Sequence, residues 1–408
     1  MDAGAYAALG DILVAAHRRD AASDAYRHAV SMDSANGDAR DGLVRLGLAA
    51  PVQTGREWTL PFSLSALFAA PTAGEIGAVI AEWRARDLSP RSVEVVARHQ
   101  ISLDGIAAEA RVVTHDVLGL RHTGVIIVPA GARRGCCPIL VEAKGVSPSF
   151  PPLNIPGSLT SPFVLGAHRG DVIYVVPGFR GEWVKVGADS LVSEGDRANA
   201  WDGAADGLIA LLNVAKQITP EADTSRVCAF GRSRGGAVAL LAGVREPSID
   251  CVVSWAAPTE WLQLMGTQGW KQEELVAEGL RRRSEPGQVG GQFINYFLKP
   301  AIAGGEDLAA TRRRIIASSV VHVVQRIPLT QAHWAEDDGS VPVINGRAFV
   351  DQFRAKRGSS ACLDARFHAE AGHDQDRQRA PKQSREFLLR VFARSDSAVA
   401  VCRARALK

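Results

Sequence analysis

The stretch "CAFGRSRGGAVALL", residues 228–241, decides the fold of this chain. It runs from an apolar, strand-like segment through a glycine-rich bend into an apolar, helix-like segment. Ser233 lies in the bend, with Gly231 two residues before it and Gly235 two residues after. This G-x-S-x-G spacing is typical of a sharp strand-to-helix turn that holds a serine hydroxyl clear of a sheet. Because so short a motif also arises by chance, its context must decide between the two interpretations.

Strand-like and helix-like segments alternate on both sides of this bend. A hairpin turning at Asp104-Gly105 comes first; strand-like runs follow at 123–130, 138–145, 171–178, 226–231, 250–256, 327–334 and 364–372, and helix-like runs at 202–217, 235–244, 346–356 and 384–394. This order predicts an α/β fold, in which a mostly parallel sheet with an antiparallel start is covered by helices on both faces. Ligands of such sheets bind at the carboxyl ends of the strands.

Three residues with catalytic side chains follow three of these predicted strands. Ser233, Asp338 and His373 each lie just past a strand end. Acyl transfer through serine needs a base that takes the hydroxyl proton and a carboxylate that orients the imidazole. The chain order Ser, Asp, His is the one that the α/β-hydrolase architecture uses.

Other residues near these positions compete for the same roles. Asp337 or Glu336 could be the acid instead, although the spacing to the following Val-Pro favours Asp338. His368 lies inside a predicted strand and is interpreted as a packed core histidine. We expect His333 to frame the acid loop.

From about residue 95 to 395 the chain resembles the catalytic domain of the prolyl oligopeptidase and dienelactone hydrolase branch of the α/β-hydrolases. Four segments carry the resemblance, in order: "GFRGEW", "DTSRVCAFGRSRGG", "HWAEDDGSVP" and "AGHDQ". The resemblance implies a serine hydrolase in which Ser233 is the nucleophile, His373 the base and Asp338 the acid. It implies no metal or organic cofactor.

The oxyanion hole is where the sequence departs from these relatives. We expect one donor to be the backbone N–H of Arg234, the residue after the nucleophile. The loop that supplies the second reads "AKGVSPSF" where relatives have H-G-G-x or a Tyr, so the N–H of Gly145 or Val146 is assigned to it. Substrate contacts are expected from Lys144, Trp261 and the side chain of Arg234, whose planar fork suits an anionic group, although an ion-paired arginine is the default interpretation.

The sequence divides into three parts. Residues 1–50 are interpreted as a TPR-like helical hairpin, 51–92 as a linker with a helix, and 93–408 as the hydrolase domain with a cap insertion at about 257–320. The TPR-like pattern rests on Tyr6, Leu9, Gly10, Leu13, Ala22, Tyr26 and Ala29, and an unrelated helical pair stays open. Because a single repeat cannot bury its apolar face, residues 1–48 are expected to dock on the main domain, on a second copy or on a protein partner.

The expected cap contains aromatic residues that could line a pocket for an apolar acyl or aromatic substrate, although ordinary helix packing explains each singly. They are Trp261, Trp270, Phe293, Tyr296 and Phe297.

Composition excludes several classes of function. The net charge of +3 is spread along the chain, so no nucleic-acid groove is indicated. The first thirty residues contain no apolar block, which argues against a secretory signal or a membrane span and makes the cytoplasm the expected location. Six cysteines without a metal-binding spacing are expected to be free, mostly buried thiols.

The favoured function is hydrolysis of a carboxylic ester or thioester in a small-molecule acyl substrate. The region before residue 95 is too short for the β-propeller with which prolyl oligopeptidases filter peptides, which places an aminopeptidase-like activity second. A carbon-carbon bond hydrolase and an acyltransferase of the same fold stay open. A scaffold protein with a vestigial site is the alternative from another class.

Overall fold

The computed structural model describes residues 3–16, 18–32, 36–46, 60–146, 152–195, 201–262, 293–358, 361–374, 379–394 and 397–406. Nine strands form one sheet in the order β1-β2-β3-β6-β4-β9-β10-β11-β12. Their bounds are β1 (Glu94–Leu103), β2 (Ile106–Val117), β3 (Leu120–Pro129), β6 (Ile173–Gly178), β4 (Cys137–Ala143), β9 (Ala222–Arg232), β10 (Cys251–Trp255), β11 (Leu329–Ala335) and β12 (Leu363–His368). The pairings from β1 to β6 are antiparallel, and those from β6 to β12 are parallel. The expected α/β fold is confirmed.

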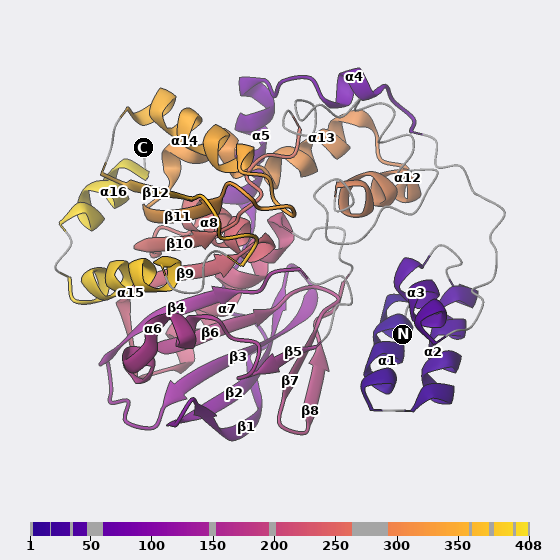
Figure 1. Cartoon of the computed structure of the whole chain (residues 1–408), viewed down its shortest axis with the longest axis horizontal. Helices are drawn as coiled ribbons and strands as arrows, with labels where there is room; N and C mark the ends of the chain where they lie inside the picture. Colours follow the sequence, from indigo (N-terminus) through magenta and orange to yellow (C-terminus); the bar gives the residue numbers. More distant parts are fainter. Residues whose placement is uncertain are drawn as a thin grey trace.

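Helices cover both faces of this sheet (Figure 1). α7 (Asp202–Ile218) and α8 (Arg234–Arg245) pack together on one face, while α6 (Ser161–Leu165) and α15 (Arg379–Phe392) pack on the other. α14 (Ile344–Arg357) packs against the short helix η4 (Val320–Arg326). Every residue of β4, β10 and β11 is buried, as expected for central parallel strands that are covered twice.

The segment expected to be a linker with a helix is packed on this body. It contains α4 (Leu64–Leu67) and α5 (Ala73–Ala85), and Leu67 and Val79 belong to the main hydrophobic core. Immediately after α5, Arg86 forms ion pairs with Asp202 and Asp206 of α7, at 2.8 and 2.9 Å.

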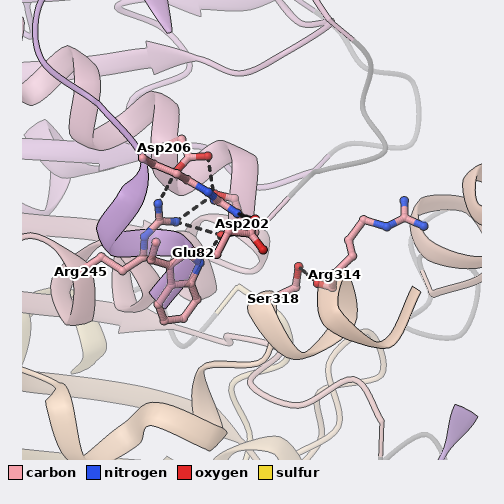
Figure 2. A network of polar contacts seen from close by, with 8 residues as sticks. Glu82, Asp202, Asp206, Arg245, Arg314 and Ser318 are labelled. Atoms are coloured by element: carbon pink, nitrogen blue, oxygen red, sulfur yellow. Dashed lines mark hydrogen bonds and ion pairs between the residues drawn. The ribbon is translucent and has the colours of Figure 1, made fainter. Parts of the chain in front are cut away.

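The same two aspartates also bind Arg245 at the end of α8 (Figure 2). Both aspartates are buried, and Asp202 also accepts a hydrogen bond of 2.7 Å from the indole Nε1 of Trp83. Paired and hydrogen-bonded in this way, the buried charges bind α5 to α7 and α8.

The amino-terminal segment consists of α1 (Ala3–Ala15), α2 (Arg19–Met32) and α3 (Gly37–Arg45), with a small hydrophobic core of its own. Tyr26 of α2 fills this core. A Cβ on Gly10 would lie 2.4 Å from the ring of Tyr26, and one on Gly42 would lie 2.2 Å from it, so both neighbouring helices need glycine there. The helices agree with the expected helical segment, and its assignment as a TPR-like repeat stays a prediction.

Several elements have no counterpart among the predicted ones. A second, three-stranded sheet contains β5 (Leu153–Ile155), β7 (Trp183–Val186) and β8 (Asp189–Val192). The described part of the expected cap includes η3 (Ile294–Leu298), α12 (Lys299–Gly304) and α13 (Leu308–Ala317), and η1 (Gly166–Gly170) and α16 (Ala398–Ala406) complete the fold. Trp270 lies outside the described residues.

The expectation of free thiols is wrong. All six cysteines are joined, in the pairs Cys136–Cys137, Cys228–Cys251 and Cys362–Cys402. Cys228 and Cys251 face each other because β9 and β10 pair in that register, which the spacing of cysteines along the sequence does not reveal. Disulfides persist mainly in oxidising compartments, and the three pairs therefore do not support the expected cytoplasmic location. That location stays an untested prediction. Among the described residues, no helix combines the length and the apolar character needed to cross a bilayer.

Candidate active site

Ser233 lies on the sharp turn between β9, which ends at Arg232, and α8, which begins at Arg234. Its backbone has φ 58° and ψ −126°, a conformation that costs energy for any residue with a Cβ and that lifts the side chain out of the sheet. A Cβ on Gly231 would lie 2.1 Å from the carbonyl oxygen of Gly235, and one on Gly235 would lie 2.0 Å from that of Ala143. Both glycines are therefore required by close backbone contacts, and the predicted strand-to-helix turn at Ser233 is present.

Asp338 and His373 meet at the same edge of the sheet, past the ends of β11 and β12. The ring Nδ1 of His373 lies 3.1 and 2.9 Å from the two carboxylate oxygens of Asp338. Asp338 is buried, and its Oδ1 also accepts the backbone N–H groups of Ser340 and Val341, each at 2.8 Å. The carboxylate is therefore fixed in place and can orient the imidazole.

The two competing acids have other partners. One carboxylate oxygen of Asp337 accepts the backbone N–H groups of Ala371 and Gly372, at 3.0 and 2.8 Å, and these hydrogen bonds lower the pKa of Asp337. Glu336 forms a surface ion pair with Arg347 at 2.6 Å. Asp337 thus holds the backbone of the histidine loop, while its neighbour Asp338 holds the ring.

An ion pair joins the serine turn to the histidine loop. Arg232, immediately before Ser233, pairs with Asp374, immediately after His373. The loop after β4 also lies close to the turn, because a Cβ on Gly145 would lie 3.7 Å from the Cβ of Ser233. Serine, histidine loop and β4 loop thus meet at the carboxyl ends of neighbouring parallel strands, where such sheets bind ligands.

Comparison with solved structures identifies the fold. Acetyl xylan esterase 1 from Thermoanaerobacterium sp. JW/SL YS485 matches with a TM-score of 0.50 and 17% identity, over 78% of this chain and 92% of that one. The acylaminoacyl peptidase of Pyrococcus horikoshii matches with a TM-score of 0.51 and 13% identity, over 71% of this chain and 42% of that one. This chain has the α/β-hydrolase fold. No protein-family model and no curated protein matches its sequence.

In this fold Arg234 is the first residue of α8, and its side chain is buried. The guanidinium binds both carboxylate oxygens of Glu182, at 2.5 and 3.1 Å, donates to the carbonyl of Gly145 at 3.3 Å, and stacks on Phe179. Burial opposes the charge of Arg234, but Glu182 outweighs it and raises the pKa of Arg234. Because the charge is paired and shielded, this geometry argues against the expected contact between the Arg234 side chain and an anionic substrate.

The other expected substrate residues lie around this edge of the hydrolase fold. Lys144 and Val146 flank Gly145 in the loop after β4, and both are half-buried. Trp261 is buried in an aromatic cluster, where its ring centroid lies 4.5 Å from that of Trp201. Tyr296 and Phe297 complete the contacts of Trp201, at 5.3 and 5.4 Å. The packing interpretation explains these aromatic residues, and substrate contacts by Lys144 and Trp261 stay predictions.

Two buried histidines, His333 and His368, lie near the ends of the strands that lead to Asp338 and His373. Nδ1 of His333 lies 3.0 Å from Nε2 of His368, and the backbone of His368 accepts the N–H of Glu336 at 2.8 Å. Burial, with a contribution from His368, lowers the pKa of His333 to about 3. His333 therefore frames the acid loop and His368 is a packed core residue, as expected from the sequence.

The roles of three groups that organise this site were not predicted from the sequence. They are Asp374, Glu182 and Asp337, which the sequence offered only as a competing acid. Each had a weak signal, since Asp337 adjoins the predicted acid, Asp374 adjoins the predicted base, and Glu182 lies within the motif "GFRGEW". Only the fold shows that each binds a residue far away in the sequence.

Proposed function

We propose that this protein is a serine hydrolase that acts on a carboxylic ester or thioester through a covalent acyl-enzyme. The hydroxyl oxygen of Ser233 attacks the carbonyl carbon while His373 takes the hydroxyl proton. His373 then gives this proton to the leaving group. Water, activated by the same imidazole, then hydrolyses the acyl-serine ester and restores the hydroxyl. Asp338 orients His373 and stabilises the imidazolium.

The observation that carries this proposal is the hydrogen bond between Asp338 and the Nδ1 of His373 beside the strained serine turn. With Nδ1 bound to the carboxylate, the neutral imidazole has Nε2 as its proton acceptor. The Arg232–Asp374 ion pair keeps the histidine loop next to Ser233 and supports a proton transfer between the two.

The proposed oxyanion hole combines the backbone N–H of Arg234 with that of Gly145 or Val146. The side chain of Arg234 supports this assignment, because it binds the carbonyl of Gly145 and so ties the loop of the second donor to the residue of the first. One such donor is worth about a hundredfold to a thousandfold in rate.

We favour an ester over a peptide as the substrate, because this chain matches nearly the whole of a solved esterase but less than half of a solved peptidase. The likeness spans 92% of the acetyl xylan esterase but only 42% of the acylaminoacyl peptidase. Peptide hydrolysis is therefore the second outcome to be tested.

Labelling with a fluorophosphonate probe tests the mechanism. The wild-type protein is expected to be labelled, Ser233→Ala is expected not to be, and Asp337→Asn should retain labelling. An unlabelled wild type would favour a scaffold with a vestigial site. Rates on p-nitrophenyl esters of graded chain length and on aminoacyl p-nitroanilides then choose between ester and peptide; faster turnover of the anilides would overturn the ester assignment.

A further inference from the structure

A cavity lies at the end of α8 that is far from Ser233. Its volume is about 370 Å³, and it lies between α5, the segment after α5, α7 and the end of η4. Ser233 precedes the first residue of α8, whereas Val244, Arg245 and Glu246 line the cavity at the other end. Since the helix has 12 residues, the two sites are about 18 Å apart.

The charges deeper in this cavity are already paired. Arg86 and Arg245 line it, and both bind the buried carboxylates of Asp202 and Asp206. Figure 2 shows Arg245 with the two aspartates. The lining carboxylate of Glu246 accepts the backbone N–H of Ser248 at 3.1 Å. These groups hold the walls of the cavity in position.

Two further arginines line the same cavity, Arg84 exposed and Arg326 half-buried, and no carboxylate of the described residues pairs with either of them. Arg84 and Arg326 line the cavity, and neither has a hydrogen-bond or ion-pair partner within the part of the chain that the structure describes. Burial lowers the pKa of Arg326, and the nearby charge of Arg84 lowers it further, so the two guanidinium groups repel each other. Two unbalanced guanidinium groups beside one cavity form a suitable site for an oxyanion, which each can bind through parallel N–H donors.

Apolar side chains supply part of the remaining lining. Ile80, Leu88, Ile209 and Val244 line the cavity, together with Trp83 and the polar residues Ser89 and Asn213. Pockets of this size bind small molecules by combining apolar walls with a few placed polar groups.

We propose that this cavity binds a small organic anion, whose phosphate or carboxylate lies between Arg84 and Arg326 and whose apolar part lies against Ile80, Ile209 and Val244. This site is separate from the proposed catalytic centre and does not depend on its chemistry.

Calorimetric titration with phenyl phosphate at low salt tests the proposal. The wild-type protein should bind one equivalent, and Arg84→Gln and Arg326→Gln should each weaken the affinity about tenfold or more, because each removes a charge-assisted hydrogen-bonding group. Arg121→Gln is the matched control, since Arg121 is exposed at the start of β3 and does not line the cavity; its affinity should equal that of the wild type.

Several outcomes would overturn the proposal. They are no binding by the wild type at millimolar phenyl phosphate, an unchanged affinity in the double variant of Arg84 and Arg326, or an equal loss in Arg121→Gln. Inorganic phosphate should bind more weakly, and an equal affinity would overturn the assignment of an organic anion. Without ligand, Arg84→Gln should melt no lower than the wild type, because it relieves repulsion; a clear fall would mean that Arg84 stabilises the fold instead of serving a ligand.

Discussion

Arg232 and Asp374 form an ion pair that joins the residue before the proposed nucleophile to the residue after the proposed base, 142 positions along the chain. Both side chains are substantially exposed, at 40% and 57%. An exposed pair of this kind contributes little to global stability. Its effect is instead local, because it sets the position of the histidine loop relative to the serine turn.

We therefore expect Arg232→Gln and Asp374→Asn to change the free energy of unfolding by less than about 1 kcal/mol. Each should lower kcat on an ester substrate by about tenfold, since small displacements of a catalytic group are costly. The double variant should be no slower than either single one, because both remove the same contact. Losses that multiply in the double variant would contradict this explanation.

Two adjacent aspartates give a sharper comparison. Asp338→Asn should lower kcat by about ten thousandfold, because it removes the carboxylate that sets the tautomer of His373. Asp337→Asn should have a much smaller effect, since Asp337 binds only the backbone of Ala371 and Gly372. Steady-state rates on one p-nitrophenyl ester measure both. Equal losses would show that the acid was assigned to the wrong residue.

One glycine beside the serine turn and one glycine in α5 predict opposite effects of substitution by alanine. Gly235→Ala should strongly destabilise the protein, because its Cβ would lie 2.0 Å from a backbone oxygen that belongs to a central strand. Gly77→Ala, in α5, meets nothing within 4 Å and should stabilise the protein by up to about 1 kcal/mol. Urea unfolding measures both, and a neutral Gly235→Ala would refute the close approach of α8 to β4.

Much of the sheet and the positions of the proposed catalytic residues could be predicted because their signals are local. Buried strands are continuous apolar runs, and the serine turn has required glycines at fixed spacing. The small sheet of β5, β7 and β8 could not be predicted, since β5 has three residues and finds its partner β7 only in the folded protein. The disulfides Cys228–Cys251 and Cys362–Cys402 were missed for the same reason, because the packing of the folded chain decides which distant cysteines meet.

A pair of buried histidines predicts sensitivity to acid. His115 and His122 face each other on β2 and β3, and their ring nitrogens have no hydrogen-bond partner in the described structure. Burial lowers the pKa of His115 to about 4 and that of His122 to about 3, with Asp116 opposing the first shift and His115 and Arg180 adding to the second. Because the unfolded state binds these protons at a pKa of about 6.5, stability should fall as the pH drops from about 6.5 towards 4.

The expected slope is about 1.4 kcal/mol per pH unit for each buried histidine. Urea unfolding at several pH values should show a shallower slope for His115→Leu than for the wild type. His168→Gln, which changes an exposed histidine, should leave the slope as it is. If His115→Leu keeps the wild-type slope, the acid sensitivity arises elsewhere.

The cysteine pairs predict the result of a thiol titration. In denaturant without reductant, the protein should react with no thiol reagent, and after reduction it should react at six positions. Six reactive thiols before reduction would restore the original expectation from the sequence. Repeating the titration on protein isolated with its thiols blocked in the cell would test the compartment.

The adjacent carboxylates of Asp337 and Asp338 constrain where this chain can change in length. Asp337 binds the backbone of the histidine loop, and Asp338 binds the ring of His373 in the same loop. A residue inserted or deleted between the two aspartates would prevent both contacts from forming at once. We therefore expect insertions and deletions to be tolerated in the other loops at this edge of the sheet but not between Asp337 and Asp338.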